Sequence, residues 1–117
     1  MNLTTTNRMV NDTTCLLGIE GEVDVYTSPQ LKQEIIKLAE SGVKRLIIDL
    51  SKVEYMDSTG LGVLISGLKR LRESEGNLAL VGPGVRITRI FEITGLDKIF
   101  DIYQTEAEAA AKEGVSL

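Results

Sequence analysis

The sequence VEYMDSTGLG, residues 53–62, joins a predicted strand to a predicted helix and decides the expected fold. Upstream of it, residues 45–50 (RLIIDL) form a short, almost continuously apolar run, which is typical of a central strand buried on both faces. We expect residues 51–58 to form a loop or a tight connection. From Ser58 onward, leucine and isoleucine recur at helical spacing, which predicts an amphipathic helix. A strand, a loop and a helix in this order form the repeating unit of α/β domains.

The rest of the chain repeats this alternation after an opening hairpin. We expect strands at 3–10, 13–20, 78–82 and 99–103, and helices that begin near residues 28, 58, 87 and 106. This order predicts one α/β domain over residues 1–117, with a mixed four- to five-stranded sheet, parallel in its centre, and helices mainly on one face. Residues 1–10 are its weak N-terminal strand, and residues 105–117 are its C-terminal helix and tail.

Capping residues predict where two of the helices begin. Ser28 can cap the first helix, or Thr27 can cap it with Gln30 completing a capping box. Thr105 and Glu108 have the spacing of a capping box for the last helix.

The composition argues against several classes of function. The 117 residues carry a net charge of −4, 4% aromatic residues and no tryptophan, which disfavours a nucleic-acid partner. The chain has no histidine, so the usual general base and the commonest metal ligand are missing. No apolar stretch is long enough to cross a membrane, no signal peptide is visible, and the single Cys15 fits a core position in a reducing compartment. We therefore expect a cytoplasmic protein with no catalytic residues, no cofactor and no metal.

The polar residues Asp57, Ser58 and Thr59 can each cap the helix that follows, so a hydroxyl is spare for another purpose. The simplest interpretation is that the segment is only a good cap. Gly60 and Gly62 lie in the first turns, where a glycine costs about 0.5–1 kcal/mol relative to alanine. They indicate either close packing of the helix on the sheet or the close approach of a partner. The patterns of a phosphate loop and of a nucleophile elbow are both absent.

Two stretches resemble those of a known family: DSTGLG at residues 57–62 and GEVDVYTSP at residues 21–29. Together they resemble the anti-sigma factor antagonists, which are single-domain members of the STAS group (sulfate transporter and anti-sigma antagonist). The order of predicted elements agrees with that family from Thr13 to Tyr103. The resemblance implies a partner switch in which an anti-sigma factor that is also a serine kinase phosphorylates Ser58. The unphosphorylated form binds this kinase and frees its sigma factor, and a serine phosphatase restores that form.

The resemblance also implies which residues bind the partner: Asp24, Tyr26, Thr27, Asp57, Ser58, Thr59, Gly60, Gly62 and Val63. For Asp24, the alternative is a loop carboxylate that caps a neighbouring backbone N–H. We expect Leu61, Leu64 and Ile65 to face the core. The cations Lys69, Arg70 and Arg72 are interpreted as a solvated face.

Two other functions stay open at this point. One is a STAS-type scaffold or sensor module that works in a stress-signalling complex without phosphorylation. The other is a small enzyme that uses carboxylates such as Asp24 and Asp57. In the favoured interpretation the protein is a monomer and a substrate, not an enzyme, and phosphorylation changes its docking surface rather than its fold. The sigma factor system is left open between general stress and sporulation. Modification of Thr59 in addition to Ser58 is also left open.

Overall fold

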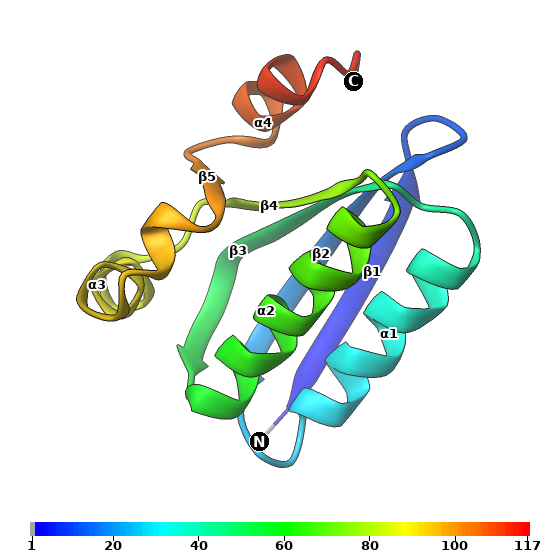
Figure 1. Ribbon diagram of the computed structural model, residues 1–117. Helices are drawn as coiled ribbons and strands as arrows, with labels where there is room; N and C mark the ends of the chain where they lie inside the picture. Colours follow the sequence, from blue (N-terminus) through cyan, green and yellow to red (C-terminus); the bar gives the residue numbers. More distant parts are fainter. Residues whose placement is uncertain (1) are drawn as a thin grey trace.

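Strands and helices alternate along residues 2–117, the part of the chain that this computed structural model describes (Figure 1). The elements are β1 (Leu3–Met9), β2 (Thr14–Val23), α1 (Ser28–Glu40), β3 (Arg45–Met56), α2 (Ser58–Glu73), β4 (Asn77–Val81), α3 (Val85–Thr94), β5 (Asp101–Tyr103) and α4 (Glu106–Glu113). The strands form one sheet in the order β1-β2-β3-β4-β5. β1 is antiparallel to β2, and the other neighbours are parallel. The expected mixed sheet with a parallel centre is confirmed, although Met1 of the expected first strand lies outside the described residues.

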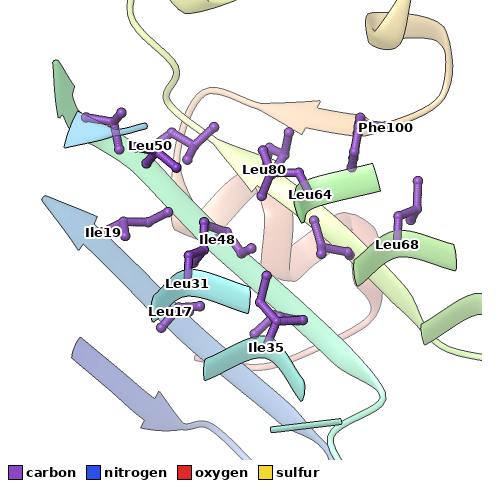
Figure 2. Close-up of a cluster of buried hydrophobic side chains, with 14 of the residues drawn as sticks. Leu17, Ile19, Leu31, Ile35, Ile48, Leu50, Leu64, Leu68, Leu80 and Phe100 are labelled. Atoms are coloured by element: carbon purple, nitrogen blue, oxygen red, sulfur yellow. The ribbon is translucent and has the colours of Figure 1, made fainter. Parts of the chain in front are cut away.

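The main core lies between the sheet and the helices α1 and α2, which lie side by side across β1–β3 (Figure 1). Side chains alternate along β3, so that Ile48 and Leu50 face these helices. Figure 2 shows Ile48 beside Leu31 and Ile35 of α1, and Leu64 and Leu68 of α2 near Leu80 and Phe100. Burying one such side chain fully stabilises the fold by about 1.5–3 kcal/mol. The apolar stripes of α1 and α2 therefore fix where the first turn of each helix lies above the sheet.

The opposite face of the sheet carries a smaller apolar cluster. Ala109 of α4 packs there against side chains of the three central strands: Leu16, Ile47, Ala79 and Val81. The helix α3 contributes Ile87 and Phe91 to the main core instead. The expectation that the helices lie mainly on one face is thus confirmed, with α4 as the exception.

The expected loop at residues 51–58 is wrong, because β3 continues to Met56. The second half of β3 pairs with β2 alone, with Val53 opposite Gly21 and Met56 opposite Val23, and with register shifts on the way. β4 ends at Val81, opposite Asp49, so the second half of β3 has no neighbour on that side. Half of its backbone stays unpaired, and its side chains are mostly polar, which made it look like a loop in the sequence. The last expected strand is also shorter, because a 3₁₀ turn (Leu96–Lys98) precedes β5.

The two predicted capping boxes differ in outcome. At α4, the Thr105 hydroxyl accepts a hydrogen bond from the backbone N–H of Glu108 (3.1 Å), which confirms Thr105 as the cap. At α1, Thr27 stands at the N-cap position but its side chain does not cap the helix. Gln30 turns away and donates from Nε2 to the backbone oxygen of Leu3 (3.1 Å), so the box predicted there is wrong.

Candidate partner-binding site

Asp57 is the residue that caps helix α2. Its Oδ1 accepts hydrogen bonds from the backbone N–H groups of Thr59 (2.9 Å) and Gly60 (3.2 Å). The same oxygen accepts a hydrogen bond from the Thr59 hydroxyl. The carboxylate of Asp57 thus takes the capping role for which the sequence offered Asp57, Ser58 and Thr59. Within residues 2–117, the exposed hydroxyl of Ser58 is left without a hydrogen-bond partner.

The loops that follow β2 and β3 are joined at one end of the sheet. The backbone N–H of Asp57 donates to the carbonyl oxygen of Val23 (3.1 Å). Gly60 packs into the same junction, because a Cβ there would lie 2.7 Å from Val23 Cγ1 and 2.8 Å from Met56 Cγ. A Cβ at Gly62 would meet no neighbouring atom within 4 Å. Gly60 therefore serves close packing of the helix on the sheet, whereas Gly62 faces open space.

Asp24 and Thr27 lie below the surface, only 4% and 7% exposed. Asp24 Oδ1 accepts hydrogen bonds from the backbone N–H groups of Tyr26 (2.9 Å) and Thr27 (3.0 Å). The Thr27 hydroxyl donates to the backbone oxygen of Glu22 (2.7 Å). The interpretation of Asp24 as a loop carboxylate that caps neighbouring N–H groups is therefore confirmed. Its second oxygen, Oδ2, is buried without a hydrogen-bond partner in the described residues.

The structure places the predicted partner-binding residues at different depths. Asp24, Thr27 and Gly60 are buried and lie beneath the surface. The exposed residues of this region define what we call the Ser58 surface: Val25, Tyr26, Ser58, Thr59 and Gly62.

The Ser58 surface includes one residue that the sequence analysis did not name, Val25, and borders on Val63. Val25 was missed, although an apolar pair in a polar loop was a usable signal; it is 58% exposed, and Tyr26 is 81% exposed. Val63 is half-buried at the edge of the surface. Leu64 is fully buried as expected, and Leu61 and Ile65 are partly buried and pack against the main core.

The charge at this end of the sheet is negative. The hydrogen bond from Thr59 and the backbone N–H groups of Gly60, Thr59 and Val25 lower the pKa of Asp57, against a smaller effect of desolvation. The carboxyl group therefore stays ionised at neutral pH. The loop sequences VDVYT (residues 23–27) and YMDSTGLG (residues 55–62) contain no cation. Both α1 and α2 begin at this end of the sheet, so the positive ends of their dipoles compensate part of this charge.

The two carboxylates of the enzyme alternative, Asp24 and Asp57, have structural partners. Within residues 2–117, no group of three or more cysteine, aspartate or glutamate side chains is placed to hold a metal ion. Asp24 and Asp57 are both engaged by backbone N–H groups, and Asp24 is buried. In the same part of the chain, no helix has the length and apolar character needed to span a membrane.

The fold and the strand–cap–helix unit at Ser58 define a known class of domain. The family model of the STAS domain matches residues 5–109. The chain therefore belongs to the STAS domain family.

Within this family, the chain is similar to regulators of sigma factors. It is 46% identical over 92 residues to the anti-sigma-B factor antagonist of Listeria monocytogenes serovar 1/2a, covering 77% of this chain and 79% of that protein. It is 44% identical over 92 residues to the anti-sigma-B factor antagonist of Bacillus subtilis, covering 79% and 84%.

Solved structures agree with this similarity. An anti-sigma factor antagonist of Mycobacterium paratuberculosis superposes with a TM-score of 0.88 at 32% identity, over 97% of this chain and 95% of that chain. The unphosphorylated anti-sigma factor antagonist SpoIIAA shares the fold, with a TM-score of 0.84 at 23% identity over 97% and 100% of the two chains.

Proposed function

We propose that this protein is an anti-sigma factor antagonist whose binding is switched by phosphorylation of Ser58. The unphosphorylated form binds an anti-sigma factor that is also a serine kinase, and this binding releases the sigma factor. The kinase phosphorylates Ser58, which ends the binding, and a serine phosphatase restores the first state. In this scheme the protein acts in the cytoplasm as a monomer and catalyses nothing itself.

The observation that carries the proposal is the position of the Ser58 hydroxyl. Asp57 and Thr59 satisfy the cap of α2 between them, so Ser58 is exposed and has no structural role of its own. A kinase reaches such a hydroxyl without unfolding the helix. The names of the relatives in Listeria and Bacillus support the same class of function.

The electrostatics of the site explain how a phosphate there changes binding. A phosphoserine adds a charge of about −1.5 to −2 at neutral pH. Asp57 already occupies two N–H groups of the first turn, and its lowered pKa keeps it ionised. The phosphate at Ser58 therefore stands beside a fixed negative charge. Its effect falls on the Ser58 surface and on any partner that docks there, while the buried core is untouched.

The test is phosphorylation by a candidate anti-sigma factor kinase with ATP, followed by mass spectrometry and by calorimetric binding of the same kinase. We expect phosphate on Ser58, none on the Ser58→Ala variant, and a loss of binding once Ser58 is phosphorylated. Ser41→Ala, at the exposed C-terminal end of α1, is the matched control and behaves as wild type. The proposal fails if Ser58→Ala is still phosphorylated to the same extent or if phosphorylation leaves the affinity unchanged.

The same experiment separates the alternative, a STAS-type scaffold or sensor that works without phosphorylation. Such a module binds its partners equally well as wild type and as Ser58→Ala, and it accepts no phosphate. Thr59→Ala shows whether Thr59 is a second acceptor, because a second phosphate then disappears from the mass spectrum. Thr59 already donates its hydroxyl to Asp57, so we expect no phosphate there.

A further inference from the structure

A groove runs between helices α1 and α2 on the outer side of the helical layer. Its volume is about 540 Å³. We call it the α1–α2 groove and define it by the lining residues that the argument uses: Lys32, Ile36, Val63, Ser66, Lys69 and Arg70. Leu31, Ile35, Leu64 and Leu68 fill the main core, and Val63 of the groove is partly buried against it.

The groove exists because small residues occupy the facing side of α2. Gly67 brings the two helices close, since a Cβ there would lie 3.1 Å from Ile35 Cγ2 and 3.1 Å from Leu78 Cδ1. Ser66 is exposed and too short to fill the space above this contact. The side chains of Ile36 and Val63 are only partly buried beside it. The groove therefore offers an apolar floor that the protein itself does not cover.

The rim of the groove is positive. Lys32, Lys69 and Arg70 line it, and Glu73 is the only acidic residue among the described lining residues. Arg70 also approaches Glu40 at 3.9 Å, but both side chains are about half exposed or more, so this ion pair holds Arg70 only weakly. A local excess of cations is unusual in a chain with a net charge of −4.

Lys69, Arg70 and Arg72 are all exposed, as expected for a solvated face, but they lie in different surroundings. Arg72 leaves the group, because its guanidinium donates to the backbone oxygen of Ile99 (3.1 Å). Lys69 and Arg70 instead line the groove with Lys32 of α1. Cations from two helices thus flank one apolar floor.

We propose that the α1–α2 groove binds an acidic amphipathic helix of the protein that docks on the Ser58 surface. Helices bind in grooves of this kind through one apolar face, and charges at the rim select partners of opposite sign. The apolar floor of Ile36 and Val63 fits the first requirement, and the three cations fit the second. This inference rests on the proposed function, because it assigns a second contact to the same partner.

The groove and the Ser58 surface are continuous along α2. Gly62 lies four residues after Ser58, and Ser66 of the groove lies four residues after Gly62, so the three residues follow one face of α2. Each of these steps is about 6 Å along the helix, which is within the Debye length of about 8 Å at physiological ionic strength. A phosphate at Ser58 therefore repels the near end of an acidic helix in the groove. With this second contact, a phosphate at one end of α2 weakens binding at the near end of the groove as well as at the Ser58 surface.

The test compares two charge-reversal pairs with the same change in net charge. Lys32→Glu with Lys69→Glu changes the groove, whereas Lys52→Glu with Lys112→Glu changes β3 and α4 and serves as the matched control. The probe is the anti-sigma factor kinase, and its affinity for each unphosphorylated variant is measured by calorimetry at low and at high salt. We expect the groove pair to weaken binding by about tenfold or more at low salt and to flatten its salt dependence. The control pair keeps an affinity close to that of wild type.

A second measurement does not depend on the variants. Addition of the kinase to methyl-labelled wild type is expected to shift the NMR signals of Ile36 and Val63. Equal affinities for the two charge-reversal pairs, or unmoved methyl signals in a bound complex, overturn the groove inference alone. A wild type that does not bind the kinase at all overturns the proposed function and this inference together. Circular dichroism confirms beforehand that both pairs are folded.

Discussion

Replacing Gly60 with alanine is expected to destabilise this protein, although alanine ordinarily favours a helix. The new methyl group would lie 2.7 Å from Val23 Cγ1, 2.8 Å from Met56 Cγ and 3.2 Å from Val23 Cβ. Val23 is a β-branched residue in a strand and moves little, so the helix has to shift away from the sheet. Gly62→Ala is the matched control, because its methyl group meets no neighbouring atom within 4 Å.

Both substitutions raise the helix propensity of α2, but only one of them also overpacks the contact between helix and sheet. Each gains about 0.5–1 kcal/mol from the higher helix propensity of alanine. Only Gly60→Ala adds the cost of overpacking, which is about 1–3 kcal/mol. The difference between the two variants therefore isolates this cost. We expect Gly62→Ala to be more stable than wild type, and Gly60→Ala to be less stable than Gly62→Ala by about 1–3 kcal/mol.

Urea denaturation followed by circular dichroism measures both free energies of unfolding. The slopes should be equal, so that the midpoints alone report the difference. Adding Val23→Ala to Gly60→Ala should recover part of the loss, because the methyl group at residue 60 then has room. The reasoning is refuted if the two alanine variants are equally stable, because Gly60 would then not be needed for the packing of α2.

Three further predictions concern ionisable groups. Asp57→Asn should lower the Tm by a few degrees at neutral pH. Because the pKa of Asp57 is lowered in the folded protein, the stabilisation that its carboxylate gives is lost as the pH falls through that pKa, so the melting temperatures of wild type and variant should become equal in acid. Glu106→Gln should raise the Tm by a degree or two at neutral pH and lose this advantage in acid, because the hydrogen bond to Asp49 and burial raise the pKa of Glu106. Equal melting temperatures of wild type and variant at every pH would contradict this. Burial and nearby carboxylates raise the pKa of Tyr103 to about 12, so absorbance titration should show a phenol ionising there that disappears in Tyr103→Phe.

The succession of strands and helices along the chain was predictable from the sequence because it follows from patterns that are local. The apolar run at residues 45–50 and the helical spacing after Ser58 each involve neighbouring residues only. The second half of β3 was not predictable in this way. Its backbone is paired with β2 alone, and that pairing depends on register shifts between segments about thirty residues apart in the chain.

The sequence predicted which loops form the candidate site, but not which of their side chains are buried. The sequence placed Asp24 and Ser58 in one patch, and the backbone contact between Asp57 and Val23 does join their loops. It did not show that Asp24 and Thr27 turn inward, because their partners are backbone groups of the same loop. Backbone N–H groups carry no signal in a residue pattern, so the sequence could not separate a supporting carboxylate from an exposed one.

The strand order β1-β2-β3-β4-β5 also bears on how the protein is made. Each strand pairs with the strand synthesised just before it, so a strand that leaves the ribosome meets an edge already in place. No segment has to wait for a distant partner, which keeps unpaired apolar strands short-lived during translation. A ribosome that pauses within this chain therefore leaves an incomplete sheet whose last strand is an open edge, and not a wrongly ordered sheet.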